Sequence, residues 1–151
     1  MPAGPLRVRQ NYLAILVAAV ACFLFEAVWY SFFLNAWLQG IGRTRAWLEA
    51  TGVNPLLQYG TALLAAALLA ATISTFTQLT GAQTALRGVR MAAALWAGCV
   101  LTTYATEYVF EVRTYSIFSI NAGFWLIGMM LMGAIVGAWK KKPRIENTAK
   151  R

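Results

Sequence analysis

Histidine and aspartate are absent from the 151-residue sequence, and all five acidic residues are glutamates. Histidine is the usual general base near neutral pH and the commonest metal ligand in proteins. Zinc, magnesium and calcium sites draw mainly on histidine, cysteine and carboxylate side chains, which are few here. The sequence therefore predicts a protein that is not an enzyme and that holds no metal ion and no cofactor.

Charged residues are also scarce, at 12% of the chain, whereas hydrophobic residues make up 60%. Soluble domains average roughly 25% charged residues, so a water-soluble core of this size could not hide so much apolar surface. The net charge is +8, and the basic residues stand almost wholly at the ends of apolar segments. Anionic lipid headgroups are therefore the predicted partner, and nucleic acid is not.

The longest apolar stretch begins close to the N-terminus. An unbroken run reaches from Tyr12 to Phe25, and mostly apolar residues continue to Leu34. About 20 helical residues cross the hydrocarbon core of a bilayer, which makes residues 12–34 a predicted first span. This stretch is longer than the apolar part of a signal peptide, about 7–15 residues, so we expect it to remain uncleaved.

Three further apolar segments predict spans over residues 56–79, 91–110 and 115–139. The connection around Val112 is so short that the last two helices must be antiparallel neighbours. We therefore expect an all-α, polytopic membrane protein with four transmembrane helices in an antiparallel bundle. Residues 1–151 would form a single membrane domain that ends in a basic tail at residues 140–151.

The basic residues also predict the orientation of the bundle. Ten of the 13 lie before the first span, between residues 79 and 91, or after residue 139, which places them on one side of the membrane. Lysine and arginine accumulate in the cytoplasmic segments of membrane proteins. Both termini are therefore predicted to be cytoplasmic.

Five polar residues inside the predicted spans make up a candidate intramembrane site: Glu26, Tyr30, Tyr104, Glu107 and Asn121. At 1.5 Å of rise per residue, Glu26 lies about 15 Å below the outer end of its span, and Glu107 and Asn121 lie nearer that surface. A carboxyl group inside a span is costly and is a functional-site hypothesis by default. One hypothesis is that these groups line a single cavity open to the outer side, with Glu26 at its floor.

The alternative is that these groups only hold helices together. Glu107 and Glu111 would then pair with Arg113, and Asn121 would form an interhelical hydrogen bond. In either case we expect Glu26 to face the bundle interior as a protonated carboxyl group. The hydrogen-bond partners predicted for it at that depth are Tyr30, Thr102 and Thr103.

Small residues mark the last two spans. Gly98 lies in an alanine-rich stretch, and Gly133 and Gly137 form a GxxxG motif. Lipid tails give no hydrophobic drive for helix association, so helices in a membrane associate through close packing. Small residues allow two helix backbones to approach closely enough for this. We expect these three glycines to serve helix packing, within the chain or between copies of it.

A set of short segments occurs in order along the predicted first and fourth spans: Trp29-Tyr30-Ser31, Ile120-Asn121-Ala122-Gly123, Met132-Gly133-Ala134-Ile135, Gly137 and Trp139. At these residues the chain resembles a bacterial family known as domain of unknown function number 1761. It implies a small four-helix protein of the bacterial inner membrane with no assigned activity. Glu26 departs from the family pattern, in which a small residue usually stands at that position.

Two functions fit these features. The first is a small structural or accessory membrane protein that forms homo-oligomers or packs on a larger membrane complex. The alternative is a small transporter or channel that uses Glu26 as a proton or cation site. A protein that copurifies in native lipid would favour the first, and a ligand bound against Glu26 would favour the second.

The predicted orientation can be tested by cysteine labelling in intact cells. A cysteine introduced at Glu49 should react with a membrane-impermeant reagent from outside, because this loop follows the first span. Cysteines at Gly88 or Asn147 should react only after the membrane is opened. Labelling of the Gly88 position from outside would overturn the topology.

Overall fold

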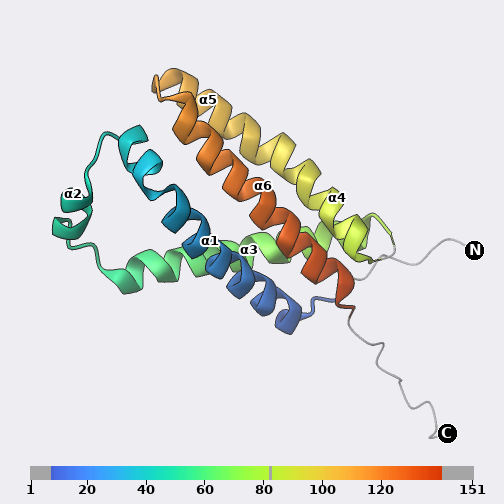
Figure 1. Ribbon diagram of the computed structural model, residues 1–151. Helices are drawn as coiled ribbons and strands as arrows, with labels where there is room; N and C mark the ends of the chain where they lie inside the picture. Colours follow the sequence, from blue (N-terminus) through green and yellow to red (C-terminus); the bar gives the residue numbers. More distant parts are fainter. Residues whose placement is uncertain (1–7, 82, 141–151) are drawn as a thin grey trace, which may run out of the picture.

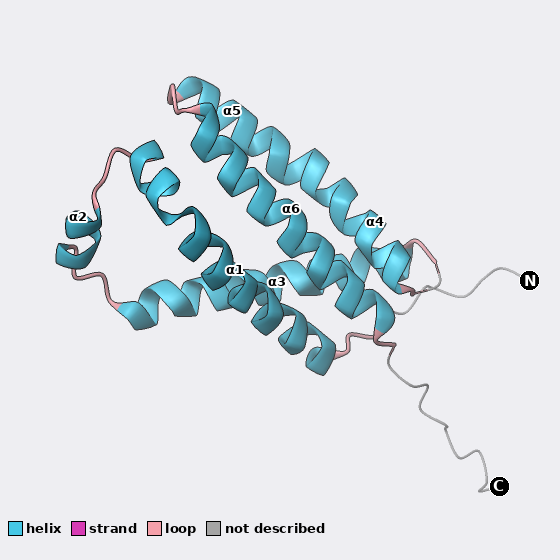
Figure 2. Cartoon of the chain, in the orientation of Figure 1, coloured by secondary structure: helices cyan, strands magenta, loops and turns pink. Residues whose placement is uncertain are grey.

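The computed structural model describes residues 8–81 and 83–140, and all regular structure in this part of the chain is helical (Figures 1 and 2). The elements are α1 (Tyr12–Gly40), α2 (Arg45–Ala50), α3 (Pro55–Leu79), α4 (Ala85–Leu95), the π-helical stretch η1 (Trp96–Leu101), α5 (Thr102–Phe110) and α6 (Tyr115–Ala138). The basic tail predicted for residues 140–151 lies outside the described residues except for Lys140.

Four helical segments are long and apolar enough to cross a membrane: Tyr12–Gly40, Pro55–Leu79, Ala85–Phe110 and Tyr115–Ala138. The third of these is α4, η1 and α5 in direct succession. The all-α fold with four candidate spans is thus confirmed. In Figure 1, α6 lies between α1 and the α4–α5 segment, while α3 crosses these helices at a steep angle.

Polar residues set the starts of the helices. The side chains of Asn11, Thr44, Asn54 and Thr84 each accept a hydrogen bond from a backbone N–H in the first turn that follows. Such caps satisfy donors that have no partner within the helix. Two helices are longer than the spans predicted from hydropathy: α1 continues to Gly40 rather than ending at Leu34, and α4 begins at Ala85 rather than at Met91.

The end of α1 is closed by a left-handed glycine. Gly42 has φ +67°, and the Arg43 N–H donates to the Leu38 carbonyl over 2.9 Å. Glycine adopts this backbone region without the steric cost that a Cβ atom brings. The chain therefore turns sharply at this point into the loop that carries α2.

One end of the bundle is tied together by side-chain amides. Gln10 Nε2 donates to Thr75 Oγ1 over 2.6 Å, and Asn11 Nδ2 donates to the Trp139 carbonyl over 3.3 Å. Gln83 Nε2 donates to the Val136 carbonyl over 2.5 Å. The first two bonds join the chain before α1 to the second half of α3 and to the end of α6, and the third joins the α3–α4 connection to α6.

The other end of the bundle is open. Every residue from 51 to 61 is exposed, and no residue of α3 before Ala66 is buried. Figure 1 shows the first half of α3 leaving α1, with α2 and its loops connecting the two separated ends. The core consequently forms around the second half of α3, where Ala66, Ala70 and Ile73 pack with α1 and α6.

Glycines bring α4 and α6 into backbone contact. A Cβ atom on Gly133 would overlap the Gly88 carbonyl oxygen and lie 2.9 Å from Ala92 Cβ, and one on Gly137 would overlap the Thr84 carbonyl oxygen. The GxxxG motif is therefore occupied within the chain. Gly98 does not share this role, because it is exposed and nothing lies within 4 Å of a Cβ placed there.

The two kinds of glycine make a matched pair for a stability test. Gly133→Leu should force α4 and α6 apart and lower the free energy of unfolding by at least about 1–3 kcal/mol, the usual cost of overpacking. Gly98→Leu adds the same side chain in open space and should leave stability nearly unchanged. Thermal unfolding of the purified protein in detergent, followed by size-exclusion chromatography, measures both. Equal melting temperatures for the two variants would contradict the α4–α6 contact.

Candidate functional site

The segment Ile120-Asn121-Ala122 of α6 receives hydrogen bonds from both neighbouring helices. Trp29 Nε1 of α1 donates to the Ile120 carbonyl over 3.1 Å, and Trp96 Nε1 of η1 donates to the Ala122 carbonyl over 3.0 Å. Away from water an unpaired indole N–H would be costly. The two tryptophans therefore fix the helices on either side of α6 at this level.

Asn121 joins three helices through its amide group. The Tyr30 hydroxyl of α1 donates to Asn121 Oδ1 over 2.9 Å, and Asn121 Nδ2 donates to the Tyr108 hydroxyl of α5 over 2.5 Å. Tyr30 and Asn121 were predicted as site residues, whereas Tyr108 was not. Its position four residues after Tyr104, on the same helix face, was the available signal.

The same network continues along α5 and α6 in both directions from the Asn121–Tyr108 hydrogen bond. Trp125 Nε1 donates to the Tyr104 hydroxyl over 2.9 Å, and the Tyr104 and Tyr108 rings meet edge to face, with centroids 5.7 Å apart. The Arg113 guanidinium lies over the Tyr108 ring, 5.2 Å from its centroid. Arg113 also pairs with Glu111, and this hydrogen bond raises the pKa of the exposed Arg113. The alternative hypothesis predicted pairing with Glu107 as well, but in the described residues Arg113 pairs with Glu111 alone.

Glu26 stands apart from this network. It is half-buried and lines a cavity of about 350 Å³ between α1 and α3. The other cavity residues used below are Phe23, Tyr30, Trp37, Gln58 and Tyr59. Within residues 8–81 and 83–140 the Glu26 carboxyl group has no hydrogen-bond or ion-pair partner, so the interior hydrogen bond predicted for it is not formed with Tyr30, Thr102 or Thr103.

Those three hydroxyl groups are engaged elsewhere. Tyr30 donates to Asn121, while Thr102 and Thr103 donate to the Gly98 and Cys99 carbonyls of their own helix, over 2.8 and 2.6 Å. A hydroxyl bonded back to its own helix turns away from neighbouring helices. The Glu26 side chain instead lines a cavity with Gln58 and Tyr59 of α3, and no residue of α5 lines that cavity.

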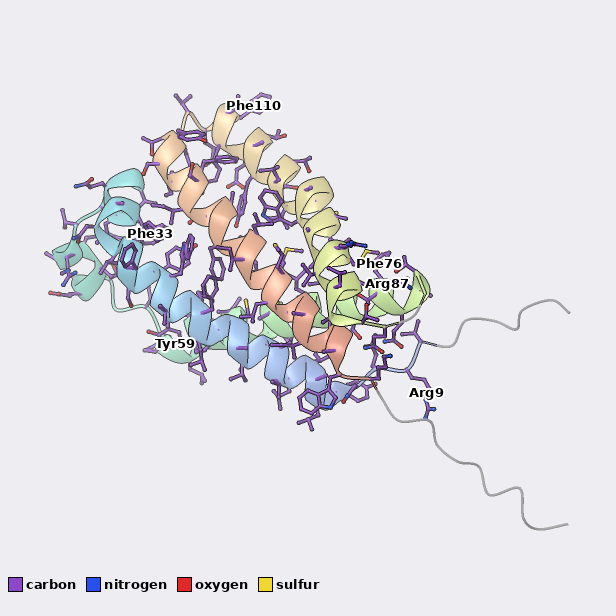
Figure 3. All side chains as sticks on the ribbon, turned by 45° about the vertical axis from the view of Figure 1, so that its right-hand side comes forward. Arg9, Phe33, Tyr59, Phe76, Arg87 and Phe110 are labelled. Atoms are coloured by element: carbon purple, nitrogen blue, oxygen red, sulfur yellow. The ribbon has the colours of Figure 1, made fainter. Side chains whose placement is uncertain are left out.

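Aromatic rings form the walls of the Glu26 cavity. The Phe23 and Tyr59 rings meet edge to face across α1 and α3, with centroids 5.9 Å apart, and Tyr30 and Trp37 meet in the same way at 5.9 Å (Figure 3 labels Tyr59). Tyr30 thus belongs to both structures: its ring lines the cavity and its hydroxyl belongs to the Asn121 network. The network fixes one wall of the cavity.

The hypothesis of one cavity shared by all five predicted residues is wrong. Tyr104 lines a separate hollow with Leu69 and Trp125, and Glu107 is exposed beside Thr102 on another part of the surface. Tyr30 and Asn121 are brought together by a hydrogen bond, and Glu26 lies beside Tyr30 alone. The described residues also contain no group of three or more metal-ligating side chains.

The Asn121 network can be tested by a double-mutant cycle. Tyr30→Phe removes only the hydroxyl group, and Asn121→Leu removes the amide without changing the size of the side chain greatly. Because the two groups share one hydrogen bond, we expect a coupling energy of about 0.6 kcal/mol, typical of interhelical bonds in membrane proteins. Unfolding of both single variants and of the double variant in mixed detergent measures it. Strictly additive effects would contradict the bond.

The residues described above fall almost entirely within one family match. The search of curated proteins finds no match, and neither does the search of solved structures. The model of the family described as "protein of unknown function (DUF1761)" matches residues 13–137. This range covers all but the first residue of α1 and the last residue of α6, and it includes every residue of the Asn121 network. Since this match covers most of the chain, the protein belongs to the DUF1761 family.

Proposed function

We propose that this protein is a small membrane transporter in which Glu26 is the proton or cation site. The observation that carries the proposal is a carboxyl group without a partner in the described chain, facing a cavity of about 350 Å³. Polar groups inside a span normally find partners in the protein, as the side chains of Trp29, Tyr30 and Asn121 do here. A carboxyl group left free in a cavity is available to a ligand from outside the chain.

The charges of the chain support the same role. Between Tyr12 and Gly40 there is no lysine or arginine, and there is none in α3 or α6. A resident cation therefore does not neutralise Glu26 from these helices. In the proposed role, the positive charge that balances Glu26 is supplied by a proton or a cation that arrives from solution or from the bilayer.

The proposal also covers the location and orientation of the protein. We place it in the inner membrane of a bacterium with both termini in the cytoplasm, where the basic ends meet anionic lipid headgroups. The role needs no catalysis, no bound metal and no cofactor, in keeping with a sequence that lacks histidine and aspartate.

A second candidate function is that of an accessory subunit, and the exposed half of α3 favours it. Leu56 and Leu57 are 81% and 68% exposed, and the GxxxG glycines are already occupied by α4. A homo-oligomer or a larger complex would therefore form through the first half of α3 rather than through Gly133 and Gly137. Native mass spectrometry of the wild type and of a Leu57→Ser variant distinguishes an assembly of this kind from a monomer.

Proton flux into proteoliposomes tests the transport proposal. Vesicles loaded with a pH-sensitive dye and containing the purified protein should respond to an imposed pH gradient faster than empty vesicles. Glu26→Gln keeps the shape of the side chain but cannot carry a proton, so its flux should fall to the level of empty vesicles. Glu107→Gln is the matched control, because it removes an exposed carboxyl group outside the cavity.

The Glu26 and Glu107 variants give distinguishable outcomes in this flux assay. Flux lost in the Glu26 variant and kept in the Glu107 variant supports transport through the cavity. Equal flux in the wild type and in Glu26→Gln contradicts it, provided that both proteins elute as folded species from a sizing column.

A further inference from the structure

The chemistry of the Glu26 cavity restricts what it can bind. One carboxyl group stands among four aromatic rings, those of Phe23, Tyr30, Trp37 and Tyr59. Aromatic faces attract organic cations through their quadrupoles, and the attraction grows when water is excluded. A carboxylate surrounded by rings therefore suits a positive charge that is carried on an apolar body.

A metal ion fits this cavity poorly. Calcium takes six to eight oxygen ligands, and magnesium keeps several waters in an octahedral shell. The cavity-lining side chains with oxygen atoms are Glu26, Gln58, Tyr59 and Tyr30, and the Tyr30 hydroxyl is already bonded to Asn121. With so few oxygen ligands, the site cannot replace the hydration shell of a metal ion.

The size and position of the cavity agree with an organic ligand. Its volume of about 350 Å³ falls within the range of roughly 300–1,000 Å³ found for small-molecule sites. Gln58 and Tyr59 lie in the stretch 51–61, in which every residue is exposed, and the first half of α3 leaves α1 at this end of the bundle (Figure 1). A ligand with an apolar body can enter there from the bilayer.

We infer that the cavity between α1 and α3 binds an organic cation of the alkylammonium class, with the charge against Glu26 and the apolar substituents against the aromatic rings. The inference rests on the proposed function, since it names the class of cation that the proposed transporter would take. The occupant of the cavity is a cationic solute rather than a lipid tail or a second copy of the chain, because only a cation complements the free carboxyl group.

Binding of benzyltrimethylammonium tests the inference. The full chain is placed in nanodiscs of phosphatidylcholine, which has no net charge, and binding is measured by calorimetry against empty nanodiscs. We expect saturable binding that Glu26→Gln weakens by at least about tenfold, because the charge partner is lost. Rubidium chloride at equal concentration should not displace the probe.

Two further variants distinguish the loss of an aromatic ring from the cavity from a general loss of folding. Tyr59→Leu keeps an apolar side chain on α3 but removes the ring, and it should weaken binding by about threefold or more. Tyr115→Leu removes an exposed ring outside the cavity and should leave binding unchanged, as should Glu107→Gln. Unaltered binding in both Glu26→Gln and Tyr59→Leu would overturn the inference.

The remaining outcomes are also decisive. Absence of saturable binding to the wild type would overturn the inference and indicate that lipid or another chain covers the cavity. Displacement by rubidium at matching concentrations would overturn it in favour of a metal-ion site. Proton flux that depends on Glu26 without binding of the probe would overturn this inference alone, whereas binding without flux would overturn only the proposed transport.

Discussion

The hydrocarbon core of a bilayer offers no water to polar groups, so each one must find its partner in the protein. In this chain the constraint is met chiefly at Asn121, whose amide joins the Tyr30 hydroxyl on α1 to the Tyr108 hydroxyl on α5. Trp29 and Trp96 add bonds to the carbonyls on either side of it. Fixing Tyr30 in this way also fixes a wall of the Glu26 cavity, and the geometry of the cavity therefore depends on a group that does not face it.

A π-helical turn keeps the α4–α5 segment facing α6 along its length. An α-helix turns about 100° per residue, so Ala92 and Tyr108 would point about 160° apart on a regular helix. A π turn takes up one additional residue, which reduces this angle to about 60°. Both residues can then contact α6, Ala92 at Gly133 and Tyr108 at Asn121. Gly98, six residues after Ala92, points away from this contact, and nothing lies within 4 Å of a Cβ placed there.

Hydropathy predicted the four spans because membrane crossing depends on length and apolar content alone. Tyr30 and Asn121 were also predictable, since a polar side chain inside a span stands out against its neighbours. The roles of Tyr108 and Gly88 could not be predicted. They depend on which face of α4 and α5 meets α6, and this is set by the π turn, which leaves no periodic pattern in the sequence. The cavity that Glu26 lines with Gln58 and Tyr59 was not predicted, because it depends on how α3 crosses α1, and hydropathy carries no information on crossing angles.

The hydrogen bonds that hold the bundle together do not involve the Glu26 carboxyl group. Trp29, Tyr30, Ile120 and Asn121, which carry the resemblance to the family, are the residues that bond α1 to α6, and a Cβ on Gly123 would lie 3.4 Å from the Trp29 ring. Glu26 lies one turn before Tyr30 and takes part in none of these bonds. A chain with a small residue in place of Glu26 would keep all of these bonds and lose only the charge in the cavity. The bonds that join α1 to α6 therefore do not depend on the proposed cation site, and Glu26 can be exchanged without removing any of them.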